Sequence, residues 1–167
     1  MKIRVDVDSE EGRGTIFRIF LPALKKNKEE KIRIRKFDKV LHGRGTILFV
    51  DDEETVLAVG SQMLEAMGYN VLSAGNGEEA VEIYRKNEGN IDLVLLDMVM
   101  PKMGGSTTYD RLKEINPDIK VILVSGFSFN DEASEILKRG CNGFIQKPYN
   151  MRELSNKIQE ILKKQEI

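Results

Sequence analysis

The residues best suited to chemistry follow short apolar runs in the second part of the chain. They are Asp51, Asp52, Asp97, Ser125 and Lys147. If the runs are strands of one parallel sheet, their carboxyl ends meet at one rim and these side chains gather there. Three converging carboxylates repel one another unless a cation neutralises them, and such hard oxygen ligands suit Mg²⁺. A phosphoryl group on Asp97 would have Lys147 and Ser125 as donors to its oxygens.

A simpler interpretation is that acids at strand ends cap the helices that follow. For Asp51 or Asp52 alone this interpretation is preferred, because Asp is common just before a helix. Five suitable residues at successive strand–helix junctions are improbable by chance. The set as a whole therefore predicts a functional site.

The elements that must position these residues alternate from Gly45 onward, with short β-branched runs followed by longer amphipathic stretches. This rhythm is typical of a parallel sheet. It predicts an α/β fold of the flavodoxin-like, doubly wound kind, with a five-stranded parallel sheet in the order 2-1-3-4-5. The expected strands are 46–50, 71–73, 91–96, 120–124 and 142–146, and the expected helices are 53–67, 77–87, 105–115, 130–139 and 151–164.

The N-terminal part of the chain has a different character. Residues 1–22 alternate as two strands around the turn Gly12-Arg13-Gly14, which predicts an N-terminal β-hairpin fragment. A lone hairpin is marginally stable, and its open edges could pair with a second copy to give a homodimer. Residues 23–44 have the composition of a charged linker, and 45–167 form the expected main domain.

Composition excludes several classes of protein. Residues 1–44 hold 13 Lys and Arg against 7 Asp and Glu, but the charges are mixed and aromatics are few, so no nucleic-acid contact is expected. No apolar run reaches the roughly 18 residues of a membrane span, and the polar start lacks a secretory signal, so no membrane contact and a cytoplasmic location are expected. Cys141 is the single cysteine and can form no internal disulfide.

Four short motifs in the expected main domain resemble the response-regulator receiver family over about residues 45 to 165. They are Val50-Asp51-Asp52-Glu53, Leu95-Leu96-Asp97-Met98-Val99-Met100-Pro101 with Gly104-Gly105, Val124-Ser125-Gly126, and Gln146-Lys147-Pro148. The resemblance implies that Asp97 attacks the phosphorus of a phosphohistidine, with Lys147 and Ser125 assisting. It also implies a cis peptide bond between Lys147 and Pro148.

The same resemblance implies a metal site. Asp52 and Asp97 would be side-chain ligands of Mg²⁺, Asp51 would assist them, and the backbone carbonyl of Met98 would be a further ligand. Mn²⁺ is expected to be able to replace Mg²⁺.

The family also suggests how a signal is read out and how long it lasts. The hydroxyl residue, here Ser125, moves to bond the phosphoryl group, and the aromatic three residues before the lysine, here Phe144, rotates into the vacated space. Phe144 could equally be an ordinary core aromatic, because it lacks the hydroxyl of a Tyr. The positions that tune hydrolysis are Val99 and Phe127, and neither can orient water, which predicts slow autodephosphorylation.

Residues 7–22, with the sequence VDSEEGRGTIFRIFLP, resemble the last glycine box and closing strands of a histidine-kinase ATP-binding domain. An ordinary hairpin is the alternative. The resemblance implies that the chain is the C-terminal part of a hybrid sensor histidine kinase, with its receiver behind the catalytic domain. His42 stands in the expected linker, not on a helix, so it is expected to be exposed and to carry no phosphoryl group.

Two functions compete. The first is phosphorelay signal transduction, in which the chain takes a phosphoryl group from a histidine kinase core or a histidine phosphotransfer protein and loses it by autodephosphorylation. The second is ATP-dependent kinase activity, which would belong to an intact parent protein, with or without a membrane anchor, and not to this chain. A DNA-binding regulator is not expected, because only a few residues follow the last expected helix.

Overall fold

The computed structural model describes residues 4–21, 40–126 and 131–163. The chain divides into two compact units, residues 1–37 and 38–167, and each is described by itself. The predicted range 23–44 lies largely outside the described residues, as does Phe127.

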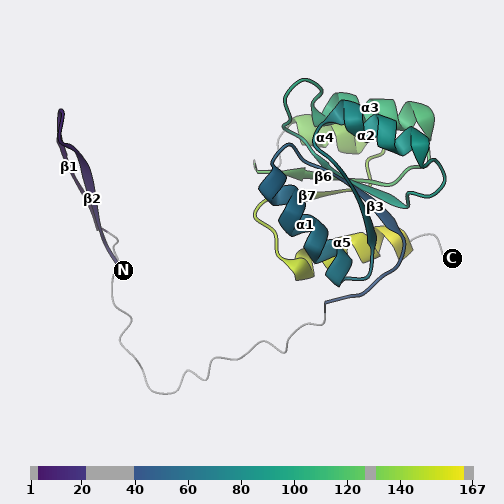
Figure 1. Ribbon diagram of the computed structural model, residues 1–167, viewed down its shortest axis with the longest axis horizontal. Coiled ribbons are helices and arrows are strands. Elements are labelled where there is room, and N and C mark those ends of the chain that lie inside the picture. The colour runs from purple at the N-terminus through teal and green to yellow at the C-terminus, as the bar shows by residue number, and fades with distance from the viewer. Residues whose placement is uncertain (1–3, 22–39, 127–130, 164–167) are drawn as a thin grey trace, which may run out of the picture. The chain divides into compact units, whose positions relative to one another are not determined.

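The second unit, which we name the receiver body after the family that its motifs resemble, is built on a five-stranded parallel sheet (Figure 1). The strands lie in the order β4-β3-β5-β6-β7, which confirms the predicted order 2-1-3-4-5. Their bounds are β3 Thr46–Val50, β4 Asn70–Ala74, β5 Leu93–Asp97, β6 Val121–Ser125 and β7 Gly143–Gln146. All five residues of β5 and of β6 are buried, as expected of central strands covered on both faces.

Five helices cover the two faces of the sheet. They are α1 Glu54–Ala66, α2 Gly77–Lys86, α3 Gly105–Ile115, α4 Asp131–Lys138 and α5 Met151–Lys163. Helices α2, α3 and α4 cover one face, and α1 and α5 cover the other (Figure 1). Alternate residues of each strand point to opposite faces, so Leu48 and Val50 join the first core cluster while Ile47 and Phe49 join the second. None of the helices in the described residues is long and apolar enough to cross a membrane.

Two details of the chain explain where its elements begin and how closely they pack. Strand β5 starts at Leu93, later than the predicted residue 91, and the Asp92 carboxylate accepts a hydrogen bond from the Thr46 backbone N–H at 2.7 Å. In α1, a Cβ added at Gly60 would overlap the ring of Phe49. The glycine therefore lets the helix lie close against β3.

Residues just before β3 belong to the receiver body as well. Val40 packs against the core cluster under α1 and α5, and the Gly43 N–H donates to the Met67 carbonyl oxygen at 2.9 Å. His42 is exposed, as expected. The packed body thus reaches at least to Val40, ahead of the expected start at Gly45.

The first unit contains the predicted hairpin. Strands β1 Arg4–Glu10 and β2 Gly14–Phe20 pair in antiparallel fashion. Val5 stands opposite Ile19 and Val7 opposite Phe17, so these four side chains share one face. They are 54% to 66% exposed.

Candidate functional site

Four polar residues meet at the carboxyl ends of the central strands. Asp51 follows β3, Asp97 ends β5, Ser125 ends β6 and Lys147 follows β7. The side chains of the first three are almost wholly buried, with Asp51 at 0%, Ser125 at 3% and Asp97 at 4% exposure. Buried carboxylates are costly unless they are paired, so their partners define the site.

Lys147 is the partner that the two buried carboxylates share. Its Nζ lies 2.6 Å from Asp51 Oδ2 and 2.8 Å from Asp97 Oδ1. The lysine is anchored at its own backbone, where its N–H donates to the Ser125 carbonyl oxygen at 2.7 Å. The peptide bond between Lys147 and Pro148 is cis, as the family resemblance implied.

Each carboxylate also accepts a backbone hydrogen bond from the residue two positions onward. Asp51 Oδ1 accepts from the Glu53 N–H at 3.1 Å, just before α1, so this carboxylate has a backbone contact besides its ion pair. Asp97 Oδ2 accepts from the Val99 N–H at 2.9 Å. These contacts leave little freedom for either carboxylate to turn.

Burial and pairing shift the protonation of the site. Burial raises the pKa of Asp97 above its ordinary value of 3.8, with Lys147 opposing the rise and Asp51 adding to it. Burial acts to lower the pKa of Lys147, but the hydrogen bonds to Asp51 and Asp97 outweigh it, so its pKa lies above 10.5. The lysine therefore stays charged at neutral pH and supplies the positive charge that the acids need.

The residues expected to hold a metal differ in their exposure and in their hydrogen-bond partners. Asp52 is exposed beside the buried Asp51. The Met98 carbonyl oxygen accepts a hydrogen bond from the Gly105 N–H at 3.0 Å, so the structure gives this predicted ligand another partner. Among the described residues, no three Asp, Glu, His or Cys side chains gather closely enough to hold a metal ion by themselves.

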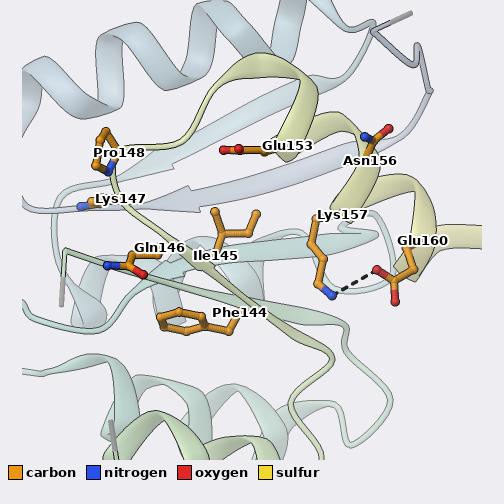
Figure 2. Close-up of a pocket in the computed structure, with 9 residues that line it drawn as sticks. All are labelled: Phe144, Ile145, Gln146, Lys147, Pro148, Glu153, Asn156, Lys157 and Glu160. Carbon is orange, nitrogen blue, oxygen red and sulfur yellow. Dashed lines mark hydrogen bonds and ion pairs between the residues drawn. The ribbon is translucent and has the colours of Figure 1, made fainter. Parts of the chain in front are cut away.

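Phe144 and Val99, which were expected to read out and tune the signal, both lie in the described part of the chain. Phe144 is half-buried in β7 and packs against the core cluster under α2, α3 and α4. It also lines a pocket of about 600 Å³ between β7 and α5, together with Lys147 (Figure 2). Val99 is 58% exposed directly after the acidic site.

Gly105 is a supporting residue to which sequence reasoning gave no role. A Cβ at this position would lie 2.5 Å from the Asp97 carbonyl oxygen and 2.7 Å from Met98 Cα. Only glycine therefore lets α3 begin directly against the backbone that carries Asp97. The glycine pair at the start of an expected helix was the available signal.

Tyr149 is the second residue that sequence reasoning passed over. It packs against the core cluster under α1 and α5 and lines an apolar pocket with Lys147 and α1 residues such as Val59. Burial raises its pKa, so its hydroxyl stays protonated beside the charged site. No spacing rule points to this residue, because its position depends on how the chain leaves Pro148.

Comparison with known proteins agrees with this geometry. The profile of the response regulator receiver domain matches residues 47–159. The sensor kinase CckA of Brucella abortus (strain 2308) is 38% identical over 166 residues, which cover 95% of this chain and 18% of that protein. The chain thus spans less than a fifth of the length of this relative.

Solved structures give the same result. The receiver domain of the hybrid histidine kinase CckA is 34% identical with a TM-score of 0.60, and the match covers 71% of this chain and 99% of that one. The response regulator TrrA of Thermotoga maritima, solved in complex with Mg²⁺ and BeF, is 31% identical with a TM-score of 0.64, covering 71% and 99%. The chain belongs to the response regulator receiver domain family, whose members act in two-component phosphorelays.

Proposed function

We propose that Asp97 of this chain accepts a phosphoryl group from a phosphohistidine with the help of Mg²⁺. The observation that supports it is the ammonium group of Lys147, placed 2.8 Å from Asp97 and 2.6 Å from Asp51. In the transfer, the phosphorus–nitrogen bond breaks as a bond forms between phosphorus and a carboxylate oxygen of Asp97. The imidazole leaves with the bonding electrons, and no net oxidation or reduction occurs.

The protein groups stabilise the charge that this step brings to the rim. Lys147 supplies a fixed cation, and Ser125 ends the strand next to β5, where its hydroxyl could donate to a phosphoryl oxygen. The Val99 N–H holds Asp97 Oδ2, which leaves Oδ1 as the oxygen that faces the lysine.

The rim offers few carboxylates, which suits Mg²⁺ better than it suits a metal that takes all its ligands from the protein. Mg²⁺ usually keeps several waters and binds one or two carboxylates together with phosphate oxygens. Asp97 and the exposed Asp52 supply such a pair, with Asp51 beside them. When bound, the ion would neutralise phosphoryl oxygens, and Mn²⁺ is proposed as a substitute because it prefers the same oxygen ligands.

The test is acyl-phosphate formation on the intact chain. Acetyl phosphate with Mg²⁺ should add one phosphoryl group, measured by intact mass, and EDTA should abolish the addition. Asp97→Asn should lose it. The matched control is Asp110→Asn, because Asp110 is an exposed aspartate on α3 that pairs with Arg139, and this variant should be labelled normally. Labelling of Asp97→Asn at the normal rate would contradict the assignment.

The hairpin is proposed to be the closing part of a histidine-kinase ATP-binding domain. Residues 1–22 would then be the kinase remnant, a linker would follow, and the receiver would pack from Val40 onward, ahead of the expected start at Gly45. Two observations support this. The CckA alignment covers 95% of this chain, more than the receiver match at 47–159. The face that carries Val5, Val7, Phe17 and Ile19 is uncovered within its own unit.

We accordingly propose a cytoplasmic receiver of a hybrid kinase whose partner is that kinase's core or a histidine phosphotransfer protein. The chain itself should take no phosphate from ATP and Mg²⁺ without a donor kinase. Incorporation from labelled ATP would contradict the proposal and favour a kinase activity. A second copy of this chain could cover the hairpin in place of a kinase domain. Analytical sedimentation tests this, because the chain would then be a dimer and Phe17→Ser would convert it to a monomer.

A further inference from the structure

The segment just before β3 is bound along α5. The Leu41 N–H donates to Ser155 Oγ at 3.4 Å, and Gln159 Nε2 donates to the His42 carbonyl oxygen at 3.1 Å. The Gly43 N–H donates to the Met67 carbonyl oxygen at 2.9 Å. The segment makes these contacts with backbone groups, so they depend on its backbone conformation and not on the identity of its side chains.

The helix side of this contact is unusually polar for a buried surface. Ser155 is 0% exposed and Gln159 is 8% exposed, on the face of α5 that also buries Leu154 and Ile158. Gln159 Nε2 makes a second bond to the Tyr69 hydroxyl at 3.2 Å. Without the segment, the Gln159 amide would lose one of its two partners, and an unsatisfied buried polar group is destabilising.

The segment passes very close to its neighbours at two glycines. A Cβ at Gly43 would overlap the Tyr69 hydroxyl and ring. A Cβ at Gly68 would lie 2.6 Å from the Gly43 carbonyl oxygen, and Gly68 itself has a φ of +93°. Val40 adds an apolar anchor to the cluster under α1 and α5.

The opposite side of α5 forms a wall of the pocket in Figure 2. Glu153, Asn156, Lys157 and Glu160 line it from the helix, and Phe144 and Lys147 line it from β7 and the residues that follow (Figure 2). The Lys157 stem lies against β7 so closely that a Cβ at Gly143 would be 2.6 Å from its Cε. A small movement of α5 therefore changes this pocket.

We propose that Val40 to Gly43 act as a strap that fixes the position of α5 and is coupled, through α5, to the pocket between α5 and β7. The strap and the pocket share one rigid helix, so release of the strap loosens the pocket wall. Coupling between two sites is reciprocal, so changes on α5 also loosen the strap. This coupling is independent of phosphoryl transfer and is measured without it.

The test is NMR-detected amide hydrogen exchange on the intact chain without phosphodonor. From the strap side, Gly43→Ala should speed exchange in the Leu154–Ile161 part of α5 by about 5-fold to 10-fold, the range that the loss of one hydrogen bond gives. It should also shift the amide resonance of Gly143, which lies against the pocket-lining Lys157. From the helix side, Ser155→Ala and Gln159→Leu should speed exchange of the Gly43 amide by a similar factor.

The control is Gly75→Ala, because the nearest atom to an added Cβ there lies 3.5 Å away, an ordinary contact. It should leave α5 and Gly43 unchanged. Exchange in α3 should stay at the wild-type rate in every variant. Two results together would overturn the proposal. One is that the amides of α5 exchange in Gly43→Ala at the wild-type rate, and the other is that the Gly43 amide exchanges at the wild-type rate in both Ser155→Ala and Gln159→Leu. The proposal would also be overturned if the Gly143 resonance did not shift in Gly43→Ala, or if amide exchange became faster throughout the body and not only in α5.

Discussion

The strands of the receiver body and those of the hairpin use the same residue types but end in different surroundings. In β5 every side chain is buried beneath helices on both faces. In the hairpin, Phe17 and Ile19 are 66% and 64% exposed, although their strands are fully paired. Pairing satisfies the backbone, whereas burial requires a second layer. The hairpin has paired strands but no second layer within its own unit, so its stability depends on what covers it.

Ion pairs in the two regions differ in the same way. The hairpin has Arg4 paired with Asp6 and Arg18 near Asp8, all at least one third exposed. Exposed pairs of this kind contribute little to stability. In the body, Lys147 joins two buried carboxylates. Removing one member of a buried set leaves charge without compensation, so only this set is expected to matter for folding and chemistry.

The largest expected effect compares one substitution in the two regions. Leu96→Ala removes a side chain that is 0% exposed in β5, and Leu21→Ala removes one that is 71% exposed. The first should lower the free energy of unfolding of the body by about 2 to 5 kcal/mol. The second should change it by less than about 0.5 kcal/mol. Urea denaturation followed by circular dichroism measures both, and equal losses would show that the hairpin is buried after all.

Lys147→Met tests the buried ion pairs against the exposed ones. In EDTA at neutral pH this substitution should lower the free energy of unfolding by about 2 kcal/mol. The loss is smaller than for a fully buried ion pair, because the lysine is partly exposed. Arg18→Met should cost almost nothing.

The pH dependence of this loss has a definite sign. Burial raises the folded pKa of Asp97 above 3.8, so the folded state binds that proton more tightly than the unfolded state does. As pH falls through the raised value, Asp97 is neutralised and the cost of removing Lys147 shrinks. The raised pKa of Lys147 means that its own contribution is complete below 10.5 and is lost as pH rises through the folded value. A cost for Lys147→Met that is the same at acid and neutral pH would contradict this account.

Val99, like Val59 in α1, is an apolar side chain of the body that is left exposed, in its case 58% exposed. Its position beside Asp97 suggests a reason, since a hydrocarbon cannot orient water for attack on an acyl phosphate. Val99→Asn adds hydrogen-bonding groups there and should shorten the phosphoryl lifetime about 10-fold. Decay of labelled protein after removal of the donor measures it. Equal decay rates for both proteins would show that Val99 does not set the lifetime.

Sequence patterns predicted the sheet well because burial governs it. The apolar run before Asp97 indicated a central strand. The alternation of strands and helices indicated the parallel sheet, and the order of its five strands came with the flavodoxin-like fold class. The polar residues at the rim were likewise identifiable from their positions at strand ends. Their pairing was not, because whether Lys147 reaches one acid or two depends on side-chain distances that no spacing contains.

The strap could not be predicted for a different reason. Leu41, His42 and Gly43 bind through backbone groups, and backbone contacts leave no hydrophobic periodicity to read. The Met98 carbonyl was assigned to a metal by family resemblance alone, and the contact with Gly105 became visible only once α3 was placed. Periodicity therefore predicts layers, while contacts between loops and helix ends require coordinates.

The smallest expected effect concerns a turn in each region. Gly12 in the hairpin turn has a φ of +80°, which glycine adopts freely, whereas Lys102 in the loop after Asp97 has a φ of 67°. A left-handed lysine is strained, and Asn tolerates this conformation better because its side chain bonds locally. Lys102→Asn should therefore stabilise the body by about 0.5 to 1 kcal/mol, measured by urea denaturation. Lys120→Asn, at a residue outside the left-handed region, should give no gain. A loss of stability in Lys102→Asn would mean that the lysine side chain contributes more than its backbone strain costs.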